Sequence, residues 1–127
     1  MKIAALIARY LLGLIFFIFG LNGFLHFIPM APPSGIAGQF LGALVVSHYM
    51  IVVFLLQLFP AILLLINRYV PLALTLLGPI IVNIFLFHAF MAPSGLPLAV
   101  VVVVLWILVA SSVWSAFAGI LQQRVQP

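Results

Sequence analysis

The stretch LPLAVVVVVLWILVASSVWSAFAGIL, residues Leu96–Leu121, decides the fold class of this chain. It carries no charged residue and is longer than the roughly 20 apolar residues that a helix needs to cross a bilayer. The valine run Val100–Val104 would favour a strand elsewhere, but a lone strand cannot satisfy its backbone hydrogen bonds in lipid. We therefore predict a transmembrane helix here.

The rest of the chain has the same apolar character. Of its 127 residues, 69% are hydrophobic and 3% are charged, whereas soluble domains carry about a quarter charged residues. Three more segments approach the length of a membrane crossing, so we predict four transmembrane helices in one domain, residues 1–127. Their expected bounds are about 3–27, 48–66, 71–91 and 96–121. The composition excludes an independently soluble protein and predicts an all-α membrane protein, a four-transmembrane-helix bundle.

The charged residues predict how the chain threads the membrane. There are four basic residues and no acidic residue: Lys2, Arg9, Arg68 and Arg124. With four crossings, both termini and the link at 67–70 share one side of the membrane, and all the cations fall there. The positive-inside rule therefore predicts cytoplasmic N- and C-termini. Cations this sparse do not make a phosphate-binding patch, so nucleic acid is not an expected partner.

An ordered set of residues occurs twice along the chain. In both halves an Arg-Tyr pair is followed by Asn and then by a loop that begins with Met-Ala-Pro and ends with Ser-Gly. The first copy comprises Arg9-Tyr10, Asn22 and Met30–Gly35, and the second comprises Arg68-Tyr69, Asn83 and Met91–Gly95. Because both copies run the same way, we predict a bundle built from two parallel helical-hairpin repeats. The alternative is that interfaces and loops simply reuse the same residue types.

Two segments need a separate interpretation. The first apolar segment begins like a signal peptide, but it is longer than a usual h-region and no Ala-x-Ala-like site follows, so we expect it to be retained. Residues 36–47 interrupt the repeat, and Gly38 and Gly42 within them would allow close helix contact. We predict an interfacial or re-entrant helix at 36–47, on the outer face of the membrane.

The residue types that are missing exclude several kinds of chemistry. Without Asp or Glu the chain holds no carboxylate acid–base pair, no Ca²⁺ or Mg²⁺ cage and no carboxylate proton relay. Without Cys it has no disulfide, no thiol redox chemistry and no thiolate-ligated cluster. Nothing resembles a nucleophile activated by a base, so we predict no catalytic residue and no enzyme activity for the chain on its own.

Three histidines are the first candidates for ligand binding. His26, His48 and His88 lie at the ends of three different predicted helices, near the outer face. Neutral imidazoles can ligate a haem iron or a chlorophyll-type magnesium, or hydrogen-bond a quinone carbonyl. Asn22 precedes His26 by four residues and shares its helix face, whereas Asn83 precedes His88 by five and does not. These residues form a candidate cofactor site, with no spacing that indicates a metal site. The alternative is that the histidines bond loop carbonyls and lipid headgroups.

Gln57 and Trp106 are polar candidates near the predicted midplane of the membrane. A buried indole N–H needs an acceptor, and the Gln57 side-chain carbonyl is expected at the same depth. We hypothesise that the two side chains bond across the helices at 48–66 and 96–121 as an uncharged lock, worth about 0.6–2 kcal/mol. The alternative is that each faces a bound pigment, lipid or quinone, or a partner subunit.

Small residues and prolines indicate how the helices pack. Ser111, Ser115 and Gly119 recur every four residues in the last segment, which predicts a stripe for close packing against this chain or a neighbouring protein. Pro60 and the Gly78-Pro79 pair interrupt their segments and predict bends.

Five blocks of sequence carry a family resemblance: Arg9–Gly13, Phe19–Phe27, Asn67–Leu72, Val82–His88 and Ala92–Gly95. Together they span most of the chain, and the pattern resembles the DoxX-like family of small four-helix bacterial membrane proteins. The resemblance implies a multi-pass protein of the bacterial inner membrane. Members of that family are associated with thiosulfate:quinone oxidoreductase or thiol-oxidant-stress complexes. Relatives commonly carry Glu near the position of Gln57, whereas this chain has an amide there, which argues against any role that depends on an ionisable carboxylate.

Two functions follow from these observations. The first, which we favour, is an accessory or scaffold subunit of a larger bioenergetic membrane complex, electron-transfer or photosynthetic, embedded among other membrane subunits and not catalytic alone. The second is a DoxX-like redox-linked membrane protein that binds a quinone, haem or chlorophyll-type pigment near the outer leaflet. An enzyme role would then be that of a subunit of a quinone-linked oxidoreductase. A small transporter fits less well, because the usual ion-coupling group is missing.

Overall fold

The computed structural model describes residues 2–127, and Met1, the first residue of the predicted domain, lies outside the described residues. The described chain contains five α-helices, two short 3₁₀-helices and no β-strand. Their bounds are α1 Lys2–Leu25, α2 Gly35–Val46, α3 Tyr49–Leu65, α4 Val70–Phe90, η1 Pro93–Gly95, α5 Leu96–Ser112 and η2 Trp114–Phe117. The predicted all-α fold class is confirmed.

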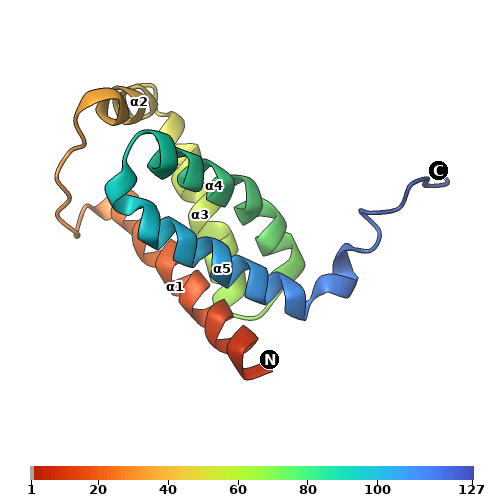
Figure 1. Ribbon diagram of the computed structural model, residues 1–127. Coiled ribbons are helices and arrows are strands. Elements are labelled where there is room, and N and C mark those ends of the chain that lie inside the picture. The colour runs from red at the N-terminus through yellow and green to blue at the C-terminus, as the bar shows by residue number, and fades with distance from the viewer. Residues whose placement is uncertain (1) are drawn as a thin grey trace.

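Four of the helices form the bundle shown in Figure 1. α1 packs against α3 and α5, and α4 packs against the same two helices, so the four close into a ring. In chain order they make two successive hairpins, α1 with α3 and α4 with α5. This order is compatible with an internal repeat, while the repeat itself stays a prediction.

The core lies inside this ring and follows helical spacing. On α1 the buried residues Ala8, Leu12 and Phe16 succeed one another every four positions, which places them on one face of the helix. α3, α4 and α5 contribute buried faces of their own to the same cluster. The largest fully buried side chains are Leu12, Leu64, Leu74, Leu77, Val109 and Pro60.

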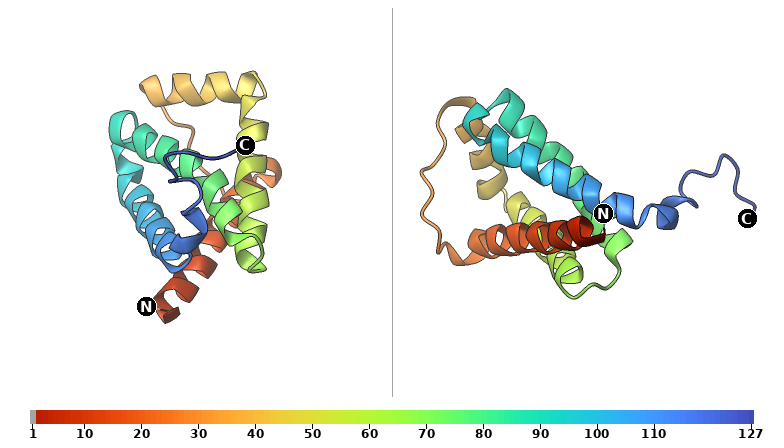
Figure 2. Two further views of the ribbon diagram at one scale, coloured as in Figure 1. Left: turned by 90° about the vertical axis from the view of Figure 1, so that its right-hand side faces the viewer. Right: turned by 60° about the horizontal axis from the view of Figure 1, so that its bottom comes forward.

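The fifth helix, α2, lies across one end of the bundle, as Figure 2 shows. It meets α3 at 88°, and the turn between them passes through His48, whose backbone is left-handed with φ 64°. Ala37 is buried, and the Phe40 ring packs against Phe87 of α4 with centroids 5.9 Å apart. A helix therefore forms where the sequence predicted one at 36–47, and its interfacial position in a membrane stays a prediction.

The helices have the length and composition of membrane spans. α1, α4 and the segment Pro93–Ser112 are each long and apolar enough to cross a bilayer, and the bent pair α2–α3 could supply a fourth crossing. α3 alone has 17 residues, and its helical rise gives it about 25 Å, against about 30 Å for a hydrocarbon core. The structure thus agrees with a multi-pass membrane protein of three or four spans.

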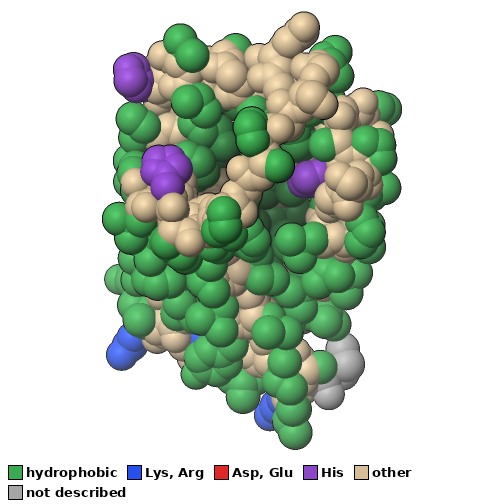
Figure 3. Space-filling view, turned by 90° about the vertical axis from the view of Figure 1, so that its left-hand side faces the viewer, with side chains coloured by type: hydrophobic (Ala, Val, Ile, Leu, Met, Phe, Trp, Pro, Cys, Tyr) green, Lys and Arg blue, Asp and Glu red, His purple; other side chains and the backbone are tan. Residues whose placement is uncertain are grey.

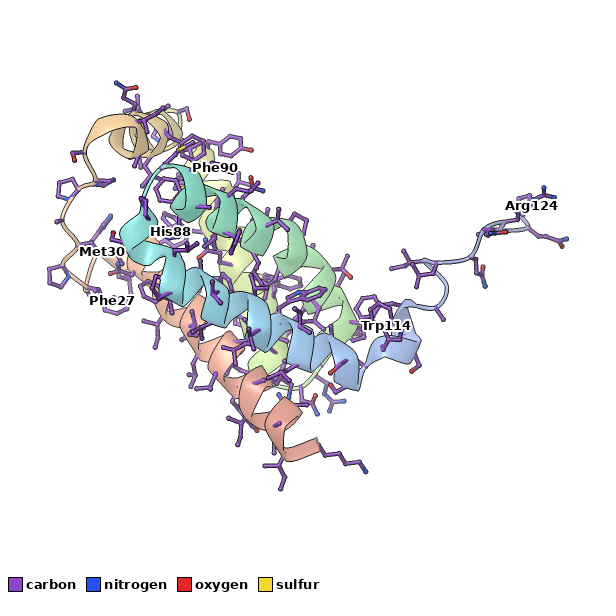
Figure 4. All side chains as sticks on the ribbon, in the orientation of Figure 1. Phe27, Met30, His88, Phe90, Trp114 and Arg124 are labelled. Atoms are coloured by element: carbon purple, nitrogen blue, oxygen red, sulfur yellow. The ribbon has the colours of Figure 1, made fainter. Side chains whose placement is uncertain are left out.

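Charged and titratable side chains separate to opposite ends of the molecule. In Figure 3 the Lys and Arg side chains in view lie toward one end of the bundle and the histidines toward the other, whereas Arg124 belongs to the C-terminal tail, outside the bundle (Figure 4). The N-terminus and the α3–α4 turn share the basic end, whereas α2 and the α4–α5 connection lie at the histidine end (Figure 1). The placement of all four cations on one side of a membrane stays a prediction. The assignment of the basic end to the cytoplasm stays a prediction.

Two helices end earlier than the sequence predicted. The first ends before His26, whose backbone is left-handed (φ 53°) and whose N–H bonds the Asn22 carbonyl at 2.9 Å, a common way to end a helix. The prediction that the last helix runs to residue 121 is wrong. At its end the Ser111 and Ser112 hydroxyls donate to carbonyls three residues earlier, which competes with regular helix geometry.

Candidate functional site

The three histidines lie apart from one another at one end of the bundle (Figure 3). His26 and His48 are exposed, and each has a left-handed backbone at the end of a helix. Figure 3 shows the histidine side chains as separate patches. Within residues 2–127, no three His, Cys, Asp or Glu side chains are grouped so that they could hold a metal ion. Because His26 lies beyond the end of α1, the predicted sharing of a helix face with Asn22 is wrong.

His88 fastens the connection between α4 and α5. Its Nδ1 lies 3.1 Å from the Ala92 carbonyl oxygen, and because a carbonyl only accepts, the imidazole donates here through Nδ1–H. The ring covers Gly95 so closely that a Cβ at that position would overlap it. Figure 4 shows His88 at the end of α4 beside this connection. The imidazole of the half-buried His88 is therefore already hydrogen-bonded to the backbone of the α4–α5 connection.

The two asparagines of the predicted repeat make different hydrogen bonds. Asn22 is buried, and its Oδ1 accepts the Ile28 N–H at 2.7 Å, which ties the chain after α1 back onto the helix. Asn83 is exposed, and its Nδ2 donates to the Pro79 carbonyl, four residues earlier in the same helix, at 2.8 Å. The asparagines are thus satisfied by local backbone groups and not by one shared site.

The predicted lock between Gln57 and Trp106 is wrong. The Trp106 indole N–H donates instead to the backbone carbonyl of Leu74, at 2.9 Å, and so joins α5 to α4. Gln57 is buried on α3, with 7% of its surface exposed, and its side chain makes no hydrogen bond with the described residues. The reason is the order of the helices in the ring: α5 packs against α1 and α4, so the indole meets a backbone carbonyl of α4 and not a side chain of α3.

The stripe predicted from Ser111, Ser115 and Gly119 does not exist as one helix face. Ser111 lies in the last turn of α5, Ser115 in η2, and Gly119 in the turns that follow. All three are exposed, and no atom outside its immediate neighbours lies within 4 Å of a Cβ placed at Gly119. Of the predicted stripe, Ser111 alone lies on a helix surface that faces outward from the bundle.

An apolar groove runs along the outside of α4 and α5. One part of it, nearer the start of α5, has a volume of about 430 Å³ and is lined by Gly78, Ile81, Val82, Phe85, Leu86, Val103, Trp106 and Ile107. The other part, nearer the end of α5, has a volume of about 500 Å³ and is lined by Trp106, Ile107, Ala110, Ser111 and Trp114. The two parts share Trp106 and Ile107 as lining residues, and we call them together the α4–α5 groove. No histidine lines it.

A buried cation is the functional candidate that sequence reasoning missed. Arg9 was interpreted as a topology marker, yet only 8% of its surface is exposed. Its Nη1 donates to the Leu64 carbonyl at the end of α3, and its guanidinium carbon lies 4.4 Å from the centroid of the Tyr10 ring. The sequence contains no signal for this, because the first segment is apolar all round and does not mark which of its faces packs inward.

Comparison with family models, with curated proteins and with solved structures finds no match to this chain. The DoxX-like resemblance therefore stays a prediction that rests on the sequence blocks quoted above.

Proposed function

We propose that this chain is an integral-membrane accessory subunit of a larger bioenergetic complex, of the electron-transfer or photosynthetic kind, and that it is not catalytic on its own. In this role the α4–α5 groove receives a transmembrane helix of a partner subunit. The chain then contributes packing surface and a fixed position in the bilayer.

The α4–α5 groove is the observation that carries this proposal. From Val103 to Ser111 it follows α5 for about 12 Å, and Trp114 lines it beyond the end of the helix. Gly78, Ala110 and Ser111 are small, and small residues let the backbones of two membrane helices approach closely. A long groove with small residues along it suits a straight helix better than a compact cofactor.

The groove can be filled without disturbing the bundle. A Cβ at Gly78 would meet one atom, Trp106 Cζ2, at an ordinary distance of 3.8 Å. Gly78→Leu therefore places a side chain in the groove, but no gain in helix stability is expected, because Pro79 follows and its ring disfavours the helical conformation of the preceding residue. Gly42→Leu is the matched control, because Gly42 lies on α2 outside the groove and a Cβ there meets nothing within 4 Å.

The experiment is native mass spectrometry on complexes extracted gently from the membrane of origin. We expect the wild type and Gly42→Leu to run with other polypeptides, and Gly78→Leu to lose them while the purified variant still unfolds cooperatively. Partners retained by Gly78→Leu would contradict the docking site. A homo-oligomer that depends on Gly78 would assign the groove to a second copy. A monomer with a small non-lipid adduct would favour the cofactor-binding function instead.

A further inference from the structure

Arg9 carries a charge that the chain itself cannot neutralise with a carboxylate. The side chain is 8% exposed, between α1 and α3, and the sequence contains no Asp or Glu. Taking a cation out of water is costly unless hydrogen bonds and an opposite charge compensate for the lost hydration. An anion from outside the chain is therefore the natural counter-charge for this group.

The contacts that Arg9 makes within the chain compensate for only part of the hydration that its guanidinium loses on burial. The Leu64 carbonyl belongs to the last turn of α3, where the helix dipole is negative, and it accepts one N–H of the guanidinium. The Tyr10 ring covers the guanidinium at 4.4 Å. Within residues 2–127 no fully buried side-chain nitrogen lacks a partner. The Arg9 nitrogens that make no bond within the chain therefore keep accessible surface and are open to an external acceptor.

A second cation lies beside the same helix end. The Arg68 main-chain N–H donates to the Leu63 carbonyl at 3.0 Å, next to the carbonyl that Arg9 contacts. The Arg68 side chain is exposed. The basic end of the bundle in Figure 3 is thus built around the end of α3. α3 has 17 residues and covers about 25 Å of a hydrocarbon core of about 30 Å, so its end lies near the edge of that core when the bundle spans a bilayer. The exposed Arg68 side chain, in the turn that follows, can then extend to the headgroups.

We propose that Arg9 and Arg68 hold the phosphate of an anionic phospholipid beside the α3–α4 turn, where the two guanidinium groups and the N-terminal end of α4 supply positive charge. Guanidinium groups match the geometry of phosphate oxygens and bind them through paired, charge-assisted hydrogen bonds. Phosphates are the anions that a bilayer supplies at this depth, and the leaflet predicted from the positive-inside rule is the one rich in anionic lipid. The site is separate from the α4–α5 groove, so this inference does not rest on the proposed function.

The test measures lipid binding to the purified chain. Native mass spectrometry counts bound phosphatidylglycerol against phosphatidylcholine, and thermal unfolding is followed in nanodiscs of either lipid. We expect the wild type to retain phosphatidylglycerol selectively and to unfold at a higher temperature in discs that contain it. Arg68→Gln, at an exposed position, should weaken phosphatidylglycerol binding about tenfold, as expected for the loss of a charge-assisted hydrogen bond.

Three further variants separate specific binding from net charge and from folding. Arg124→Gln removes the same charge from the C-terminal tail, away from the bundle in Figure 4, and should leave lipid binding unchanged. Arg9→Lys keeps the charge but not the paired donors, so it should lower selectivity for phosphatidylglycerol. Arg9→Gln removes the charge as well, and it should also lower the thermal stability of the chain.

Three results would overturn the proposal. Equal loss of binding in Arg68→Gln and Arg124→Gln would mean that net charge alone attracts the lipid. Unchanged phosphatidylglycerol binding in both Arg9→Lys and Arg68→Gln would leave Arg9 as a cap of α3 only. Equal stabilisation by inorganic phosphate in phosphatidylcholine discs would assign the site to a soluble anion.

Discussion

Replacing Trp106 by Phe removes one hydrogen bond that joins α5 to α4. In the native chain the indole N–H donates to the Leu74 carbonyl at 2.9 Å, and Leu74 itself is fully buried. Phe keeps most of the apolar contact area but has no donor. The substitution therefore isolates the contribution of the N–H group.

The expected cost is about 0.6–1.7 kcal/mol, the range measured for hydrogen bonds between membrane helices. A large cavity term does not add to it, because Trp106 lines the open α4–α5 groove and the neighbouring space is already accessible. A change of 1 kcal/mol moves the midpoint of thermal unfolding by about 2–8 °C for domains near this size. We expect a decrease of this order for Trp106→Phe.

The assay is reversible unfolding in mixed micelles, followed by circular dichroism so that loss of a tryptophan does not affect the signal. Trp114→Phe is the matched control, since Trp114 is 58% exposed and its contact is a ring packed 5.9 Å from that of Phe117. This control should lower the unfolding midpoint by clearly less than Trp106→Phe does.

A double-mutant cycle with Gln57→Leu tests the identity of the acceptor. Because the indole bonds a backbone carbonyl, the free-energy changes of Trp106→Phe and Gln57→Leu should add to within about 0.5 kcal/mol. Gln57→Leu alone should be neutral or stabilising, since it replaces a buried amide that makes no hydrogen bond with the described residues. A coupling energy above that limit, or equal effects of the two tryptophan substitutions, would refute the reasoning.

Two further substitutions test the histidine end of the bundle. Asn22→Ala leaves the Ile28 N–H without its acceptor, so it should lower the free energy of unfolding by about 1–3 kcal/mol and speed hydrogen exchange at that amide. Asn83→Ala is the control and should change the free energy of unfolding by less than about 0.5 kcal/mol. Equal effects of the two substitutions would contradict the structure. Gly95→Ala places a methyl group where the His88 ring lies, and the overpacking should cost about 1–3 kcal/mol and lower the midpoint of thermal unfolding. An unchanged midpoint would show that the ring lies elsewhere.

Helix type and approximate helix positions were predictable because the membrane environment restricts the choice. Segments this apolar must satisfy their backbone groups internally in lipid, and helices do so within a single segment. Backbone conformation and side-chain hydrogen bonds decided where the helices end. The left-handed residue His26 and the Ser111-Ser112 pair ended helices that hydropathy alone would extend.

The candidate site was less predictable, and Asn22, Asn83 and Arg9 show why. The asparagines occupy matching places in the apparent repeat, yet one is buried and the other exposed. Arg9 looks like a surface cation by residue type, yet it packs inward against α3. Residue type and spacing indicated which groups need partners, but they did not indicate which partner each group finds.

The sequence by itself determined that this chain is all-α and has helices of membrane-spanning length. Only the tertiary structure decided which face of each helix turns inward. The physical reason is the mean hydropathy of +1.54, because helices that are apolar all round have no polar face to mark the outside. Rotation is then set by close packing and by a few hydrogen bonds, such as those from Trp106 to Leu74 and from Arg9 to Leu64.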